Sequence, residues 1–216
     1  MFDRIKLFLK GNILEIVSGI GNISAVCVQQ GVALNVSDMI ENYLSILRQR
    51  FLGQPLVKKI FRVDLADENF ESNCTSLLGT FDTVFALNVV EHIANDKLAI
   101  ANGAKLLKKD GHIIILVPAY NALYNGIDEG LEHFRRYNRK SLNGLLADDF
   151  DVIKTSYFNL AGMVGWFVTG NVMGKKTLLE ELVKLYNRMV PLFRVADAVT
   201  FNQMGLSVIA VGKKKA

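Results

Sequence analysis

Hydrophobic residues in the first half of the chain fall in short runs that alternate with stretches of helical spacing. The runs begin at Ile13 and cover 32–36, 58–63, 83–87 and 112–117, and each is short enough to be a strand. Between them, Ile40, Tyr43, Leu44 and Leu47 recur every three or four residues, and 96–107 repeats that spacing. Five such alternations predict an α/β fold with a doubly wound sheet.

The pattern is looser after Pro118. Residues 119–140 predict a long loop, Ser141 is a candidate N-cap of a helix that reaches Ala147, and 150–158 and 207–212 predict two further strands. We therefore expect a Rossmann-like, seven-stranded, mostly parallel sheet with a helical insertion between the last two strands. The expected division of the single domain 1–216 is a core at 11–118, a loop and helix at 119–150, and an insertion at 159–204.

The expected insertion is unusually apolar. Residues 155–174 carry no charge, and 178–190 predict a helix with a broad apolar face. Length alone would allow a membrane span, but strands of one sheet on both sides argue against a single crossing. Two interpretations stay open, a helical subdomain packed on the sheet and a lid or membrane-surface contact through 159–200.

Composition narrows the class of protein. Two cysteines are too few for a disulfide framework or a zinc knuckle, and the first ten residues lack the apolar core of a secretory signal. We expect a cytoplasmic protein, with membrane association through the insertion as an addition. The net charge of +4 includes a basic group at 135–140, which is either solvated surface or a site for an anion.

Polar residues stand where the predicted strands end. Glu15 is a carboxylate inside an apolar run, and an unpaired charge there would be costly, so it requires a polar partner. The run breaks into a glycine turn, which suits a negative group. Asp38 follows at close to the ~20-residue spacing of a ribose-binding acid, and Asp64 and Asn88 end the next two strands. A nucleoside-like ligand is expected.

Several segments carry a family resemblance over residues 12–118. LEIVSGIGN at 14–22, VSD at 36–38, VDL at 63–65, NVVEHI at 88–93 and LLKKDG at 106–111 occur in one order. In that order and at that spacing they resemble the motifs of class I S-adenosylmethionine-dependent methyltransferases. A nicotinamide dehydrogenase would share the first of these segments but not EHI at 91–93 or LLKKDG at 106–111.

The resemblance implies a set of cofactor-binding residues. Asp38 would hold the ribose hydroxyls. For both Asp38 and Asp64 the alternative is that they cap the turns at which they lie. Glu91 would be either a functional residue or a carboxylate in the first turn of a helix. The implied binding residues are Glu15, Val17, Ser18, Gly19, Gly21 and Asn22 in the first motif, Met39 at the adenine, Asp64 and Leu65 at the adenine edge, and Asn88, Val89 and His92 near the sulfonium. The family usually carries a glycine at the position of Val17.

The loop after the fifth strand resembles a subgroup that has a tyrosine, an aspartate and then His-x-Arg-Arg-Tyr. The matching residues are Tyr124, Asp128, His133, Arg135, Arg136 and Tyr137, and Glu132 replaces a usual glycine. His133 is the candidate base, Arg135 or Arg136 the candidate anion clamp, and Tyr137 completes the catalytic set. The alternative is a surface loop held by arginine–carboxylate pairs.

These observations predict an S-adenosylmethionine-dependent methyltransferase that yields S-adenosylhomocysteine. The acceptor would be small or lipid-linked, and the basic loop would allow an anionic one. No metal site is predicted. One alternative is a cofactor-binding protein without transferase activity, for which Val17 and Glu132 are the motivating departures. The other is a nucleic-acid methyltransferase, although no aromatic–proline motif follows the fourth strand.

Overall fold

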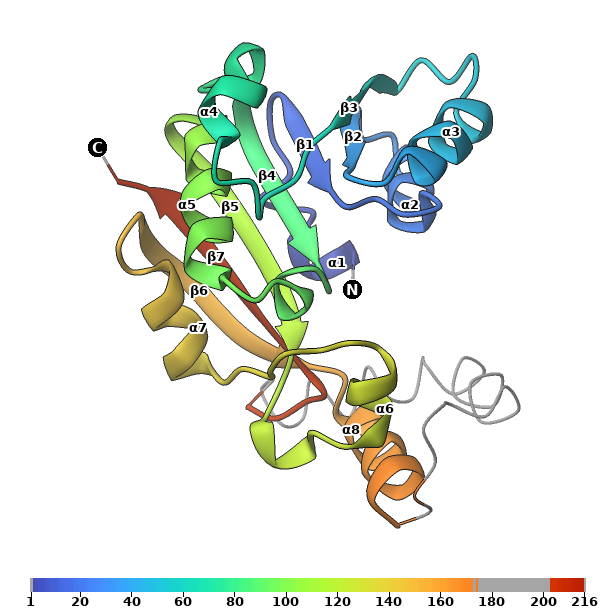
Figure 1. Cartoon of the computed structure of the whole chain (residues 1–216), viewed down its shortest axis with the longest axis vertical. Helices are drawn as coiled ribbons and strands as arrows, with labels where there is room; N and C mark the ends of the chain where they lie inside the picture. Colours follow the sequence, from blue (N-terminus) through green and yellow to red (C-terminus); the bar gives the residue numbers. More distant parts are fainter. Residues whose placement is uncertain (1, 173, 175–202, 216) are drawn as a thin grey trace.

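A computed structural model of the chain describes residues 2–172, 174 and 203–215 (Figure 1). Its centre is a seven-stranded sheet of order β3-β2-β1-β4-β5-β7-β6, in which β7 runs antiparallel to both neighbours. The strands are β1 Ile13–Ile16, β2 Leu34–Asp38, β3 Val57–Arg62, β4 Phe81–Leu87, β5 Leu107–Pro118, β6 Phe150–Phe158 and β7 Ser207–Lys214. The predicted Rossmann-like, mostly parallel sheet is confirmed.

Helices connect the strands in the predicted alternation. The α-helices are α1 Phe2–Ile5, α2 Asn22–Gln29, α3 Glu41–Arg50, α4 Phe70–Asn73, α5 Asp96–Leu106, α6 Gly126–Gly130, α7 Arg139–Leu146 and α8 Leu160–Phe167. Short 3-10 helices are η1 Thr75–Leu77, η2 Val90–His92 and η3 Asn121–Leu123, and a π-helix, η4, covers Val168–Val172. Figure 1 shows α6 and α8 beyond the end of β5, where the chain leaves the parallel part of the sheet.

The sheet separates two hydrophobic cores. Along β5, Ile113 and Ile115 belong to the core that includes α4, α5 and α7, while Ile114 and Leu116 belong to the core that includes α1, α2 and α3. Because successive side chains of a strand point to opposite faces, an unbroken apolar run is what a strand covered on both sides requires. The doubly wound arrangement follows from that run.

Two predicted boundaries are wrong for polar reasons. The second strand lies two residues later than predicted and includes Asn35 and Ser37, which are buried because each donates to a backbone carbonyl of β1. The N-cap of α7 is Asn138, whose side chain accepts from the Ser141 backbone, while the Ser141 side chain completes a capping box. Apolar spacing cannot locate polar residues that hydrogen bonding places inside.

The insertion is described only in part. Its first residues form α8 and η4, and Val164, Phe167 and Val172 on them are exposed. The predicted apolar helix at 178–190 lies outside the described residues. Among residues 2–172, 174 and 203–215, no helix is long and apolar enough to cross a membrane. The membrane contact stays a prediction.

Candidate active site

The polar strand ends meet where the strand order reverses, between β1 and β4. Ligands of doubly wound sheets bind at this point because the connections on either side leave in opposite directions. Here β1 enters the turn 17–21, and β4 is followed directly by Asn88, which is exposed with φ 55°. The edge predicted from the sequence therefore exists.

The glycine turn after β1 is held by its own backbone. Gly21 N–H donates to the Ser18 carbonyl (2.8 Å), and Ser18 N–H donates to the Ser37 carbonyl of β2 (2.7 Å). A Cβ at Gly21, where φ is 80°, would lie 2.6 Å from the Phe51 ring, whereas one at Gly19 would meet no atom within 4 Å. Gly21 is thus required by packing, and Gly19 presents an open backbone surface that a ligand can approach.

Asp38 supports this turn from below. Its carboxylate is fully buried, with Oδ2 accepting from Gly19 N–H (2.9 Å) and Oδ1 from Ile40 N–H (3.0 Å), next to α3. These are the contacts of the capping alternative. Both carboxylate oxygens already accept from backbone N–H groups. A further hydrogen bond, donated by the ribose hydroxyls to this carboxylate, stays a prediction.

Glu15 has the polar partner that its position requires. The Ser24 hydroxyl on α2 donates to Glu15 Oε2, and the carboxyl group is buried. Burial raises the pKa of Glu15 to about 7, against the hydrogen bonds from Ser24 and Ser18, which lower it. The side chain ties β1 to α2, as expected for a residue that orders the motif.

The other predicted cofactor residues surround the same edge. Met39 is exposed at the end of β2, and Asp64 is half-buried, with Oδ1 accepting from Ala66 N–H (2.8 Å). Leu65 is buried and its carbonyl accepts from Asn102, Val89 is buried, and the Asn22 side chain accepts from Arg50 (3.0 Å). The open turn and the exposed Met39 and Asn88 fit a nucleoside-like group, while Asp38 is placed as support.

The two departures from family glycines share one backbone feature. Val17 has φ 52° and Glu132 has φ 59°, both in the left-handed region. A non-glycine residue costs about 1–2 kcal/mol there, and a branched residue such as valine is a particular outlier. The chain has kept the glycine conformation without the glycine.

We expect Val17→Gly to increase the affinity for S-adenosylmethionine, because it removes a stiff branched side chain and its strain from the turn a ligand approaches. Glu132→Gly is the matched control. It relieves a positive φ away from the glycine turn and should leave that affinity unchanged. Calorimetry checks both variants, and equal or weaker binding by Val17→Gly would contradict this expectation.

A cavity opens beside Asn88 on the side of β5 and β7. Its volume is about 450 Å³, within the range of small-molecule sites. The polar lining residues are Asn88, Glu91, His92, His133, Arg136, Asn159 and Ser207, and the apolar ones are Leu116, Pro118, Leu131, Phe158, Trp166 and Leu206. The loop after β5 therefore contributes Leu131, His133 and Arg136 to the lining of this cavity.

His133 is fixed in this cavity by a buried ion pair. Asp128 Oδ1 lies 2.8 Å from His133 Nδ1 and accepts from Arg136 Nε at 2.7 Å, and Arg136 Nη1 donates to the Ala119 carbonyl (3.0 Å). The Trp166 ring covers the guanidinium at 4.6 Å. Burial opposes ionisation of Asp128, but hydrogen bonds from His133 and Arg136 lower its pKa. With Asp128 as the acceptor, the neutral tautomer of His133 that fits this contact has its hydrogen on Nδ1 and its lone pair on Nε2.

Arg135 and Tyr137 are turned to another partner. Arg135 Nη1 lies 2.7 Å from Asp96 Oδ2, and the Tyr137 hydroxyl donates to the same oxygen (2.8 Å). Neither residue lines the cavity described above. The structure brings His133 and Arg136 of the predicted catalytic set to the site and gives the other two a contact with the start of α5.

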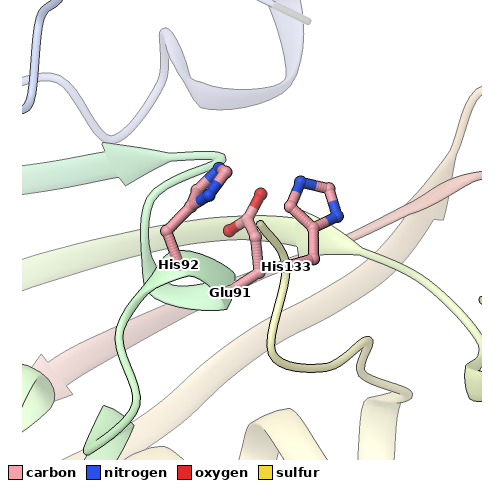
Figure 2. A group of neighbouring side chains, drawn as sticks. All are labelled: Glu91, His92 and His133. Atoms are coloured by element: carbon pink, nitrogen blue, oxygen red, sulfur yellow. The ribbon is translucent and has the colours of Figure 1, made fainter. Parts of the chain in front are cut away.

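Sequence reasoning placed no site role on Asp128 or Trp166 and left Glu91 undecided. Glu91 lies in η2, fully buried, and burial raises its pKa to about 8 although the charge of Arg136 lowers it. Figure 2 shows its carboxyl group close to the imidazoles of His92 and His133. The usable signal was the segment NVVEHI, whose acid directly precedes a histidine at a strand end.

Comparison with known proteins identifies the family. A sequence model described as a methyltransferase domain matches residues 1–155. The chain belongs to the class I S-adenosylmethionine-dependent methyltransferases. The comparison with curated proteins found no match to this chain.

Solved structures agree with this fold at low sequence identity. An S-adenosylmethionine-dependent methyltransferase from Archaeoglobus fulgidus has a TM-score of 0.61 at 17% identity, covering 99% of this chain and 91% of its own. Phosphoethanolamine N-methyltransferase 2 of Haemonchus contortus, solved with S-adenosylmethionine, has 0.62 at 15%, covering 98% and 51%. The [4+2]-cyclase SpnF has 0.66 at 15%, covering 99% and 79%. The fold is thus shared with a protein named for different chemistry.

Proposed function

We propose that this methyltransferase methylates a hydroxyl group of a small, uncharged acceptor, or of the end of a lipid-linked one, bound in the cavity beside Asn88. The observation that carries the proposal is His133. His133 lines the cavity and its Nδ1 is held by Asp128, which makes Nε2 the ring nitrogen that can accept a proton from an acceptor. Bound S-adenosylmethionine would supply an electrophilic methyl group, held by the turn 17–21 with Met39, Asp64, Leu65 and Asn88.

The charges of the cavity favour an uncharged acceptor over the anionic one that the basic loop allowed. Arg136 is paired with Asp128, and Arg135 is paired with Asp96. A guanidinium that already has a carboxylate partner offers little to an anion, and Glu91 adds a further acidic group. The six apolar lining residues suit a mostly apolar acceptor and exclude water from the reacting group.

Transfer of radiolabel from methyl-labelled S-adenosylmethionine tests the proposal. The protein is incubated with small-molecule, lipid and nucleic-acid fractions, and S-adenosylhomocysteine is measured alongside. We expect acceptor-dependent product with label in the small-molecule or lipid fraction. Label in nucleic acid would support the nucleic-acid alternative, and no product above the level of His133→Ala with any fraction would support a binding protein without turnover.

A further inference from the structure

Glu91 is a carboxylate without an evident counterpart. It is fully buried, and neither of its oxygens has a hydrogen-bond partner within the described part of the chain. The neighbouring cation, Arg136, is already paired with Asp128 and donates to the Ala119 carbonyl. A buried carboxylate in this position is costly unless it holds a proton or meets another positive charge.

Two imidazoles lie close to this carboxyl group (Figure 2). The ring centroids of His92 and His133 are 4.7 Å apart and the rings are nearly perpendicular, at 78°. One ligand atom from each of Glu91, His92 and His133 can be chosen so that all lie within 4.8 Å of one another. Three groups that bear lone pairs therefore converge on one small volume of the cavity.

We propose that Glu91, His92 and His133 bind a divalent transition-metal cation. Two imidazoles and one carboxylate with open positions are the ligand set of catalytic zinc and non-haem iron sites, and imidazole ligands disfavour Mg²⁺ and Ca²⁺. Two ligand atoms at ~2.1 Å from one ion are at most about 4.2 Å apart, so a small side-chain rotation closes the set.

The surroundings of His133 are those of a metal-bound histidine. Such histidines usually donate their second ring N–H to a carboxylate, which fixes the tautomer and increases ligand basicity. Asp128 accepts that hydrogen bond here at 2.8 Å, and it is itself fixed by Arg136. His92, which supplies the other imidazole, is exposed.

The catalytic consequence rests on the proposed function. An acceptor hydroxyl in the cavity would meet the cation at its open positions, and the cation would lower the pKa of that hydroxyl, whose proton leaves to water. His133 would then act as a ligand in place of being the base. Cation binding itself does not depend on methyl transfer and is measured without S-adenosylmethionine.

Titration with Zn²⁺ tests the site. The 216-residue chain is used without a tag and after removal of bound metal by a chelator. Zn²⁺ binding is measured by calorimetry, and Co²⁺ binding is measured by visible absorption. We expect about one tight equivalent of Zn²⁺ and no comparable binding of Mg²⁺. Glu91→Gln, His92→Gln and His133→Gln should each weaken Zn²⁺ at least about 100-fold, and Asp128→Asn about 10- to 100-fold. The His92 variant changes an exposed side chain, so its fold should be preserved.

His112→Gln is the matched control, because His112 lies within β5 and not among the cavity residues. It should bind Zn²⁺ like the unmodified protein. A protein that binds no Zn²⁺ would overturn the site. Equal Zn²⁺ binding by the three ligand variants and the unmodified protein would also overturn it, and would place the bound zinc elsewhere, for example at Cys27 or Cys74. If the protein binds Zn²⁺ at this site but its turnover is unchanged when a chelator removes the metal, the catalytic consequence alone would be overturned.

Discussion

Replacing His133 by alanine should lower kcat by about 100- to 10 000-fold, the range that a positioned acid–base group contributes. The reason is geometric, since His133 lines the cavity beside Asn88 and Asp128 holds its Nδ1, which leaves Nε2 to accept a proton. The affinity for S-adenosylmethionine should be unchanged, because the turn 17–21 and Met39 lie on separate elements. Steady-state kinetics and calorimetry together separate the two effects.

The matched control for this variant is His112→Ala. His112 pairs with Thr83 and Lys213 in the sheet, and burial and the charge of Lys213 lower its pKa. His112→Ala should leave kcat the same as that of the unmodified protein. A His133→Ala enzyme that retains full turnover, with its circular dichroism spectrum intact, would show that this histidine has only a structural role.

The second large effect is on stability. Burial raises the pKa of Glu15 from 4.5 to about 7 in the folded protein. Between these values the folded state holds a proton that the unfolded chain has released, so the free energy of unfolding falls as the pH rises. One pKa unit corresponds to about 1.4 kcal/mol. Glu15 therefore lowers the free energy of unfolding by about 3 kcal/mol as the pH rises from 4.5 to above 7. Below pH 4.5 this loss is absent.

Glu15→Gln should abolish this contribution while it keeps an oxygen that can accept from Ser24. Urea denaturation at pH 5 and pH 8 gives the pH dependence for each protein. Glu41→Gln is the control, since Glu41 is exposed on α3 and paired with Arg48. Parallel pH dependence of Glu15→Gln and the unmodified protein would contradict the assignment to Glu15.

Much of the fold could be predicted because apolar periodicity reports burial. The strand β5 is buried on both faces and its run of isoleucines identified it at once, and the polar strand ends located the edge of the sheet that carries the site. The prediction was less good where polar residues are inside. Asn35 and Ser37 moved the boundary of β2 because hydrogen bonds to β1 stabilise them.

The candidate site could be predicted only in its first half. The motif at 14–22 lies within one strand–turn–helix unit, so sequence spacing reports its geometry. The second half depends on side-chain contacts that spacing does not report, such as Asp128 with Arg136 within one irregular loop and Trp166 of α8 over that guanidinium. No periodicity marks such contacts, which is why Glu91 stayed undecided and Arg135 could not be told from Arg136.

The central claim is that the donor and the acceptor meet at Asn88, between the glycine turn and the His133 cavity. A crystal structure with S-adenosylhomocysteine tests it most directly. We predict density for the nucleoside beside Met39 and Asp64, with the sulfur at Asn88 facing the opening lined by His92 and His133. Density for the ligand away from the turn 17–21, or with its sulfur directed away from that cavity, would contradict the account.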